Sequence, residues 1–331
     1  MNFAIITESL SKSFNDFTAV DNISFKVKRG EVFGFLGPNG AGKTTTINML
    51  VTLLKPTSGT ALVNGFNVSN QKNEVRNNIG VVFQTPALDD KLTGQENLNF
   101  HSMLYGLNKQ SREKRINEVL KLVDLTDKAD VLVEKYSGGM KRRLEIARGL
   151  IHKPKVLFLD EPTLGLDAQT RRRIWDYIKQ LNRKEKITIM LTTHYMEEAD
   201  YLCNRVAIID KGRIIISGSP SSLKNKLGGD VITLELTGAI DKFINNCIKE
   251  KWIKKIKQHD NFVNITATNG DKRIPRLISL ASGSKVIVKS VNLRKPSLED
   301  VFLHHTGRTI REQEASVTER FMMRRPMHGR H

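Results

Sequence analysis

Apolar and polar residues follow one another along the chain in a pattern that predicts strands and helices in mixed order, and hence an α/β fold. Strand-like apolar segments of the first two thirds cover residues 3–8, 23–27, 31–36, 79–84, 155–162 and 187–194. The last two are continuous apolar runs that stop at polar residues, which is typical of interior strands in a parallel sheet covered on both faces. Helical spacing recurs in Ile47, Leu50, Val51 and Leu54 and through most of 88–135.

Two short turns that contain glycine predict hairpins. Lys28-Arg29-Gly30 stands between 23–27 and 31–36, and Asp210-Lys211-Gly212 divides the apolar segment 206–218. Both turns have the length and the residue types of a tight reversal. We therefore expect each turn to connect two neighbouring antiparallel strands.

The last third of the chain has the pattern of a separate small domain. Residues 218–230 are interpreted as the linker region, and the predicted order beyond it is strand, helix, strand, strand, helix, strand, at 231–237, 240–251, 252–257, 262–267, 273–281 and 285–293. This βαββαβ order is typical of a ferredoxin-like module. A further helix is predicted at 296–307, with Ser297 as N-cap and Asp300 at its third position. The expected parts are 1–222, 223–307 and a basic tail at 308–331.

The charge balance points to an anionic partner. The 331 residues carry a net charge of +18, and residues 221–331 hold 21 Lys and Arg against 11 Asp and Glu. Aromatic residues make up only 6% and no interleaved basic–aromatic platform appears, so we expect an anionic membrane surface rather than nucleic acid. Cys203 and Cys247 lack metal-ligand spacing and predict free thiols. We expect no signal peptide and no membrane span in this sequence.

The segment GPNGAGKTTT, Gly37 to Thr46, matches a phosphate-binding P-loop between a predicted strand and a predicted helix. Glycines at 37, 40 and 42 allow backbone N–H groups to close around phosphates, and the helix N-terminus adds its positive end. Lys43 would neutralise the β- and γ-phosphates, and the Thr44 hydroxyl would bind Mg²⁺. A chance glycine-rich turn is the alternative, and the strand–loop–helix context argues against it.

Polar residues end three other apolar strands. Asp160 and Glu161 follow VLFL, where Asp160 would position Mg²⁺ and Glu161 would act as general base for the attacking water. Gln84 and His194 also stand at strand ends. Taken alone, such residues are usually hydrogen-bonded caps. Because doubly wound sheets bind ligands at the carboxyl ends of their strands, the four residues together indicate one site.

Five segments resemble, in this order, the ATP-binding-cassette ATPases: GPNGAGKTT, FQ at 83–84, YSGGMKRRLEIARGL at 136–150, LFLDEPTLGLD at 157–167 and TTHYMEEAD at 192–200. The resemblance covers roughly residues 3–220. It implies a P-loop NTPase cassette with a mixed sheet core, an antiparallel β subdomain and a helical subdomain. It also implies ATP and Mg²⁺ as ligands. The family assembles two cassettes head to tail, so the SGG loop of one chain contacts the γ-phosphate held by the other.

The resemblance assigns further roles. Gln84 resembles the residue that senses γ-phosphate and Mg²⁺, Asp167 the acid that crosses the dimer interface, and His194 the switch histidine that stabilises the γ-phosphate. The residues expected at ATP are Phe14, Gly37, Pro38, Asn39, Gly40, Ala41, Gly42, Lys43, Thr44, Thr45, Ser137, Gly138, Gly139 and Asp167, those at Mg²⁺ are Thr44, Gln84 and Asp160, and the catalytic ones are Glu161, His194 and Gln84.

Three points of the resemblance carry alternatives. Phe14 falls where the family stacks an aromatic ring on adenine, but a core phenylalanine without that role is the other reading. Tyr136 and Met140 depart from the commonest LSGGQ signature, although Ser137, Gly138 and Gly139 keep the phosphate contact. Lys141-Arg142-Arg143 is expected to be a solvated helix face.

The segments YSGGMKRRLEIARGL, GLDAQTRRRIWDYI and KPSLEDVFLHHTGR together resemble the daunorubicin-resistance type of multidrug exporter cassette. This implies a separate polytopic membrane permease as partner, a homodimer of ATPase subunits and a peripheral position on the cytoplasmic face of the cell membrane. Residues 85–107 would contact the permease, unless their apolar side chains, among them Leu88, Leu98, Phe100 and Met103, only pack the helical subdomain. The alternative function is a non-transport cassette ATPase acting on nucleic acid or ribosomes.

Overall fold

The computed structural model describes residues 2–15 and 17–306. These residues divide into two compact units between Gly218 and Ser219, which we call the N-terminal unit and the C-terminal unit. The division falls a few residues before the boundary expected from composition. Among the described residues, no helix is long and apolar enough to cross a membrane.

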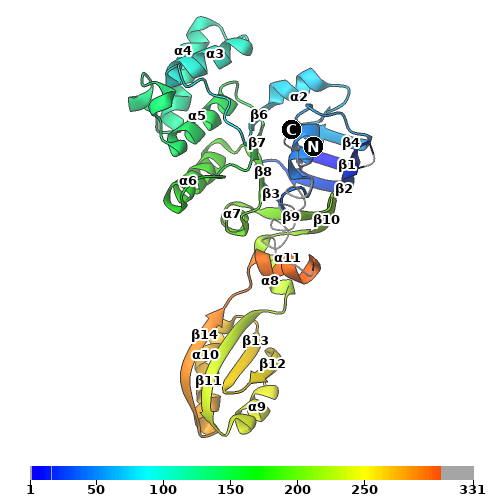
Figure 1. Ribbon diagram of the computed structural model, residues 1–331, viewed down its shortest axis with the longest axis vertical. Coiled ribbons are helices and arrows are strands. Elements are labelled where there is room, and N and C mark those ends of the chain that lie inside the picture. The colour runs from blue at the N-terminus through cyan, green and yellow to red at the C-terminus, as the bar shows by residue number, and fades with distance from the viewer. Residues whose placement is uncertain (1, 16, 307–331) are drawn as a thin grey trace, which may run out of the picture. The chain divides into compact units, whose positions relative to one another are not determined.

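A six-stranded sheet forms the centre of the N-terminal unit (Figure 1). Its order is β10-β9-β3-β8-β7-β6, and its bounds are β3 Val32–Leu36, β6 Ile79–Val82, β7 Val156–Asp160, β8 Thr188–Thr193, β9 Arg205–Asp210 and β10 Arg213–Gly218. The pairs from β6 to β9 are parallel, and β10 is antiparallel to β9. The predicted interior strands β7 and β8 and the β9–β10 hairpin are therefore confirmed.

A second, antiparallel sheet contains β1 Phe3–Phe14, β2 Phe17–Lys28, β4 Ser58–Val63 and β5 Phe66–Asn67, in the order β2-β1-β4-β5. The predicted hairpin across Lys28–Gly30 is wrong, because β2 and β3 lie in different sheets. The burial pattern explains this. From Ile23 on, alternate residues of β2 are buried, whereas all five residues of β3 are buried, and such a strand requires a place covered on both faces.

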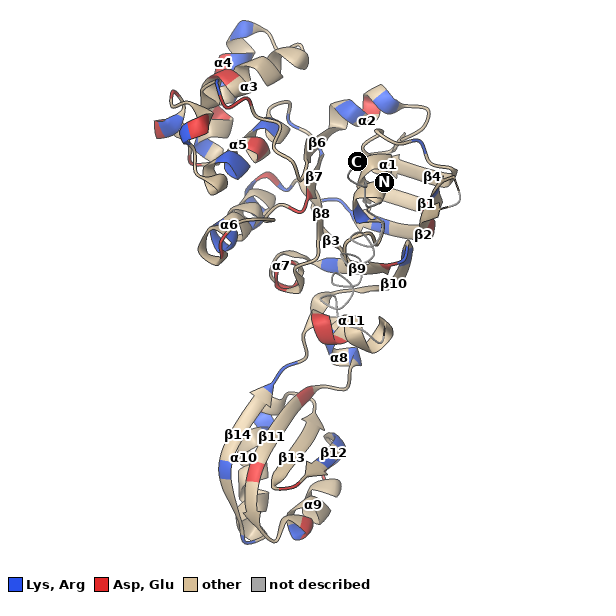
Figure 2. Ribbon diagram, viewed as in Figure 1, with Lys and Arg blue, Asp and Glu red and all other residues tan. Residues whose placement is uncertain are grey.

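Helices α3 Gly94–Leu104, α4 Lys109–Leu122 and α5 Gly138–Leu150 group at one side of the six-stranded sheet, and the antiparallel sheet lies at its other side (Figure 1). The remaining helices of the N-terminal unit are α1 Lys43–Leu50, α2 Lys72–Asn78, α6 Ala168–Glu185 and α7 Met196–Leu202, with short 3-10 turns at Thr126–Lys128 and Val133–Lys135. The helical reading of 88–135 is confirmed. Charged residues of both signs lie along α4, α5 and α6 (Figure 2).

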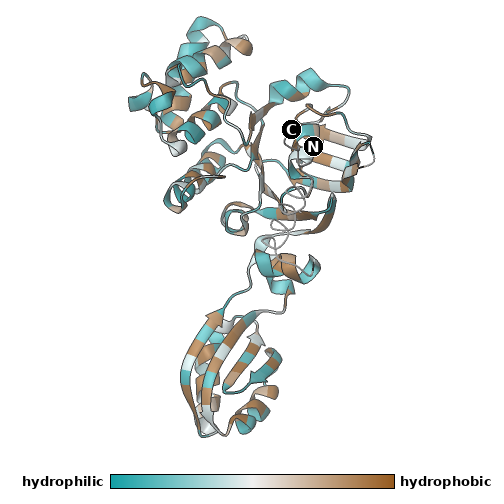
Figure 3. Cartoon of the chain, viewed as in Figure 1, coloured by the Kyte–Doolittle hydropathy of each residue, from teal (hydrophilic) through white to brown (hydrophobic). Residues whose placement is uncertain are grey.

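The C-terminal unit has the predicted βαββαβ order. Its elements are β11 Asp230–Gly238, α9 Ile240–Ile248, β12 Ile253–His259, β13 Phe262–Ala267, α10 Gly270–Gly283 and β14 Val286–Arg294. The sheet order β12-β13-β11-β14, antiparallel throughout, is that of a ferredoxin-like fold. Apolar residues alternate with polar ones along its strands (Figure 3), and the inward set packs on Phe243 and Leu277 from the two helices.

Two further helices of the C-terminal unit, α8 and α11, come before and after the βαββαβ segment in sequence. Helix α8 Pro220–Lys226 occupies most of the segment interpreted as a linker, because Ser219 caps it by accepting from the Ser222 N–H and Pro220 suits its first turn. Helix α11 Leu298–Thr306 begins where the sequence predicts, and its capping box is present: the Asp300 N–H donates to the Ser297 hydroxyl at 3.1 Å, and the Ser297 N–H donates back at 2.8 Å. The predicted tail at 308–331 lies outside the described residues.

Candidate nucleotide-binding site

The glycine-rich loop connects β3 to α1 at the carboxyl edge of the six-stranded sheet. A Cβ atom on Gly37 would lie 2.3 Å from the Ile209 carbonyl oxygen, and one on Gly42 would lie 2.5 Å from that of Ala19. Gly42 also has a φ of +103°, which L side chains rarely adopt. Close packing behind the loop thus requires glycine at these two positions. This requirement adds to the one predicted from the motif, that the loop backbone must approach the phosphates closely.

Lys43, the first residue of α1, is buried and directs its ammonium group at three oxygen atoms. Its Nζ donates to the carbonyls of Gly37 at 2.9 Å and Pro38 at 3.1 Å, and it lies 3.3 Å from Glu161 Oε1. A lysine that is only 5% exposed requires such anionic or carbonyl partners. The loop therefore holds a cation beside its own N–H groups, a combination that suits phosphate.

Oxygen atoms of three residues meet next to this lysine. The Thr44 hydroxyl donates to Asp160 Oδ2 at 3.1 Å, and the Thr192 hydroxyl donates to Asp160 Oδ1. Asp160 is buried at the end of β7. A carboxylate and a hydroxyl are hard oxygen ligands of the kind that Mg²⁺ takes beside phosphate oxygens. The residues present therefore fit a magnesium ion.

Glu161 lies between the side chains of Lys43 and His194. Its Oε1 faces Lys43, and its Oε2 lies 3.1 Å from His194 Nδ1. Burial raises the pKa of Glu161, but the hydrogen bond from His194 and the charge of Lys43 outweigh this effect, so the pKa lies below its ordinary value. The carboxylate is therefore ionised at neutral pH and available to accept a proton.

A cavity of about 450 Å³ opens beside Lys43, Thr44 and Glu161, whereas Asp160 and His194 are not among its lining residues. Its lining includes the loop, Gln84, Glu161 and Phe17. The predicted adenine-stacking residue Phe14 is not among the lining residues; it lies beneath Lys12, whose Nζ is 5.0 Å from the ring centroid. Phe17, which pairs with Phe14 across the β1–β2 turn, is an aromatic residue that does line the cavity, and the sequence interpretation did not include it.

Ser137 and Asp167 lie at a different place from the cavity. Ser137 is the N-cap of α5 and accepts from the Met140 N–H at 3.3 Å, and Asp167 is the N-cap of α6 and accepts from the Thr170 N–H at 2.9 Å. The two helix starts are in contact, because a Cβ atom on Gly139 would come within 2.6 Å of Thr170 Cγ2. The structure thus brings the predicted SGG loop and Asp167 together, apart from the chain's own P-loop cavity.

The expectation that residues 141–143 form a solvated helix face is wrong for Arg142. This residue is 7% exposed and donates hydrogen bonds to backbone carbonyls of other segments. Helical spacing could have indicated that Arg142 is buried. Gly139, Arg142 and Glu145 are three residues apart and lie on the buried face of α5. Lys141 and Arg143 remain partly exposed, as expected.

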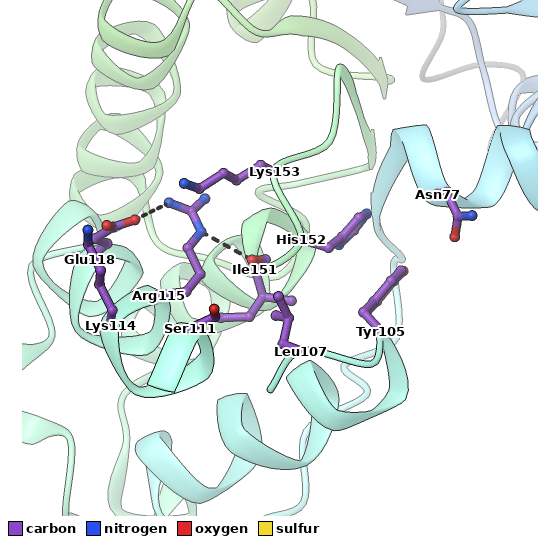
Figure 4. Close-up of a pocket in the computed structure, with 10 residues that line it drawn as sticks. All are labelled: Asn77, Tyr105, Leu107, Ser111, Lys114, Arg115, Glu118, Ile151, His152 and Lys153. Atoms are coloured by element: carbon purple, nitrogen blue, oxygen red, sulfur yellow. Dashed lines mark hydrogen bonds and ion pairs between the residues drawn. The ribbon is translucent and has the colours of Figure 1, made fainter. Parts of the chain in front are cut away.

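A larger cavity of about 600 Å³ lies elsewhere in this unit, between α4 and the turn after α5 (Figure 4). Arg115 donates to the Ile151 carbonyl at 3.1 Å and to Glu118 at 2.9 Å within it. His152 and Tyr105 stack with ring centroids 3.8 Å apart at its other end. It contains no glycine-rich loop and no buried carboxylate, whereas the 450 Å³ cavity is lined by both and therefore has the chemistry for a nucleotide.

The fold and the site together define a P-loop nucleotide-binding protein of the ATP-binding-cassette class. A family model described as "ABC transporter" matches residues 20–164, and one described as "ATP-binding protein DrrA1-3-like, C-terminal domain" matches residues 218–306. The linearmycin resistance ATP-binding protein LnrL of Bacillus subtilis is 40% identical over 92% of this chain and 99% of its own. The daunorubicin resistance ATP-binding protein DrrA2 of Streptomyces coeruleorubidus is 39% identical over 95% and 98%.

Solved structures of ATP-binding cassettes are similar to this chain as well. That of cbiO1 from Clostridium perfringens, part of the ABC transporter complex cbiONQ, has a TM-score of 0.64 and 30% identity over 69% of this chain and 92% of its own. A dimeric post-hydrolysis structure of the ATP-binding cassette MJ0796, bound to ADP and Pi, has a TM-score of 0.58 and 28% identity over 65% and 98%. The chain belongs to the ATP-hydrolysing, ATP-binding proteins of ABC transporters, in the group related to drug-resistance exporters. The alternative of a nucleic-acid cassette is not favoured.

Proposed function

We propose that this chain is the ATPase subunit of an exporter for a drug, antibiotic or lipid-like molecule, and that the 450 Å³ cavity is where it hydrolyses ATP. The observation that carries the proposal is the position of Glu161. It is a carboxylate only 8% exposed that lies between Lys43 and His194 at the edge of this cavity. A buried, ionised carboxylate with these partners beside the cavity supports a role for Glu161 as general base.

The binding roles follow from the contacts of the loop. Backbone N–H groups from Gly37 to Thr45 would surround the β- and γ-phosphates, and the ammonium of Lys43 would neutralise their charge. Thr44, Asp160 and Gln84 would hold Mg²⁺. When bound, Mg²⁺ would withdraw negative charge from the phosphate oxygens. Because Phe17 lines the cavity and Phe14 does not, Phe17 would be the aromatic residue that stacks on a base.

The catalytic roles divide between two side chains. Glu161 would accept a proton from water as the water oxygen forms a bond to the γ-phosphorus and the bond to ADP breaks. His194, held by its contact with Glu161, would donate a hydrogen bond to the γ-phosphate as charge develops there. Products are ADP and inorganic phosphate.

Ser137, Gly138, Gly139 and Asp167 would act on the ATP of a second copy. They lie together at the starts of α5 and α6 and do not line the cavity of their own chain. A helix start that presents free N–H groups suits the γ-phosphate of a partner in a head-to-tail homodimer. The dimeric relative MJ0796 supports this arrangement.

The permease would contact the segment after Gln84. Leu98 is buried in the helical region, but Phe100 and Met103 on the same helix α3 are 61% and 53% exposed. Exposed apolar residues that cluster in this way mark an interaction surface. Leu104 and Tyr105 are also exposed, so this surface is suited to contact with a polytopic membrane subunit. Such a subunit would hold the chain at the cytoplasmic face of the membrane. The net charge of +18 would favour anionic lipids there.

Substituting Glu161→Gln tests the catalytic part. Removal of the general base should lower ATP turnover by about 10² to 10⁴-fold, whereas ATP binding and ATP-dependent dimerisation persist. Steady-state phosphate release, equilibrium binding of ATP and size-exclusion chromatography measure the three properties. Turnover equal to that of the unmodified protein would remove Glu161 from the mechanism.

Affinity isolation of the tagged chain from detergent-solubilised native membranes tests the transport part. We expect a stoichiometric polytopic membrane protein with the unmodified chain, less of it with Phe100→Asp, and an unchanged amount with Gln95→Asp, which adds the same charge at an exposed position of the same helix. Recovery of ribosomal or nucleoid material without a membrane protein would contradict the exporter role and leave the ATPase assignment in place.

A further inference from the structure

Arg142 connects three segments that meet at the catalytic edge. From helix α5 its Nε donates to the Pro162 carbonyl at 2.7 Å and its Nη1 to that of Phe83, also at 2.7 Å. Its Nη2 donates to the carbonyls of Asp160 at 3.1 Å and Glu161 at 3.2 Å. All three nitrogen atoms of the guanidinium therefore donate to backbone oxygens of residues that we place at the nucleotide site, or of their immediate neighbours in sequence.

Glu145, one turn further along α5, completes the connection. It is 1% exposed, accepts from Arg142 Nη1 at 3.0 Å, and accepts from the Ala87 N–H at 2.7 Å. Arg148 Nη1 donates to the Ala87 carbonyl at 3.2 Å. The chain from Phe83 to Ala87 is thus bonded to α5 at both ends, and Gln84 lies between the two attachment points.

One of the carbonyls that Arg142 bonds belongs to Glu161, whose backbone has an unusual conformation. Glu161 has a φ of +48°, in the left-handed region that residues other than glycine, asparagine and aspartate seldom adopt. Its N–H donates to Thr192 at 3.1 Å, and its carbonyl accepts from Arg142. A strained backbone persists only where the surroundings fix it on both sides, and Arg142 supplies one of these two sides.

We propose that Arg142 is a positioning residue that couples the Ser137–Gly139 end of α5 to the Gln84 segment and to the Glu161 backbone. This inference rests on the proposed function. Because a guanidinium is planar and its donors keep fixed directions, a shift of α5 changes its bonds to both segments at once. Contact between Ser137–Gly139 and a partner's nucleotide would thereby set the position of the general base in the same chain.

The test compares Arg142→Gln and Arg142→Lys with Arg143→Gln in the complete chain. Arg143 is the matched control, because it is the next residue of α5 and also donates to backbone carbonyls, those of Val123 and Asp124, both at 2.9 Å and both within the helical region. The readouts are kcat and KM for ATP, the affinity for ATP in the absence of turnover, and thermal unfolding.

We expect Arg142→Gln to lower kcat by about 10²-fold, as a small misplacement of a catalytic group does, with ATP affinity within about threefold. Arg142→Lys should be intermediate, because one nitrogen replaces three. Arg143→Gln should leave kcat within about threefold. Equal losses of kcat in the two glutamine variants, or an unchanged kcat in a folded Arg142→Lys protein, would overturn the proposal. Failure of both Arg142 variants to fold would do the same, since Arg142 would then be a structural residue.

The proposed function is checked in the same series by the unmodified chain and Glu161→Gln. If the unmodified chain releases no phosphate, or if Glu161→Gln releases it at the same rate, the proposed function fails whatever Arg142 does. If both behave as expected while Arg142→Gln keeps its kcat, only the coupling role fails.

Discussion

The two units of the molecule bury different kinds of side chain. Among the described residues, the buried charged side chains all belong to the N-terminal unit: Glu31, Lys43, Arg142, Glu145, Asp160, Glu161 and Glu198. In the C-terminal unit the described core is apolar, and Ser284 is its buried polar residue. Because a buried charge costs free energy unless it is paired, a unit that keeps seven of them has a use for most of them.

This contrast separates what stabilises a domain from what makes it act. The sheet of β11–β14 and its two helices satisfy the ordinary rule that apolar faces pack together, and most of their charged residues stay at the surface. The carboxyl edge of the six-stranded sheet instead concentrates carboxylates and cations within hydrogen-bond distance of one another. The ATPase chemistry that we propose therefore depends on the buried charged groups of the N-terminal unit.

The largest effect is expected from a cavity in the C-terminal core. Phe243 of α9 is fully buried there, so Phe243→Ala should lower the free energy of unfolding of this unit by about 3–5 kcal/mol. Ile248→Ala, on the same helix but 66% exposed, should change it by no more than about 0.5 kcal/mol. Amide hydrogen exchange of β11–β14 in the full chain measures both, and equal effects would show that the core assignment is incorrect.

A smaller effect, dependent on pH, is expected from Glu198 in the N-terminal unit. Burial raises its pKa above 4.5. Hydrogen bonds from Thr193, Thr163 and Trp175 and the charge of Arg171 lower the pKa, but burial outweighs them. The folded state then binds this proton more tightly than the unfolded state, so the stability that protonation provides is complete below pH 4.5 and is lost as pH rises through the raised pKa.

Replacement by Glu198→Gln should remove that dependence. The free energy of unfolding of the unmodified protein, minus that of the variant, should fall as pH rises above 4.5, by about 1.4 kcal/mol for each unit by which the pKa is raised. Denaturant unfolding across this pH range measures the difference. A difference that stays constant or grows with pH would contradict a raised pKa, and the C-terminal unit, with no such buried acid described, should show no counterpart.

Much of this organisation could be predicted from the sequence. The P-loop, the acids at the end of β7 and the polar residues that follow β6 and β8 were identified because the chemistry of phosphate and Mg²⁺ requires particular residues at fixed spacing. The βαββαβ order of the C-terminal unit was predictable because alternation of period two and helical spacing are local signals. The capping box at Ser297 was predictable for the same reason.

The rest depends on which segments meet in space. The turn at Lys28–Gly30 has local hairpin chemistry, and only the burial of β3 on both faces decides that the chain changes sheets there. Arg142 stands in a run of basic residues that resembles a solvated helix face, and its backbone partners belong to other segments, Phe83 just after β6 and Asp160 at the end of β7. Phe17 could not be preferred to Phe14 because both flank the same turn. The roles assigned to the site residues stay predictions.

The smallest effects should be equal in the two units, because helix capping is local. Each unit has one described capping box of the same type, Thr93 with Glu96 at α3 and Ser297 with Asp300 at α11. Thr93→Ala and Ser297→Ala each remove the side-chain acceptor of one helical N–H, which costs about 0.5–2 kcal/mol. Amide exchange in the first turn of each helix should therefore accelerate by similar factors. If Thr93→Ala had a much larger effect than Ser297→Ala, the difference between the units would extend beyond their buried charges to the way their helices begin.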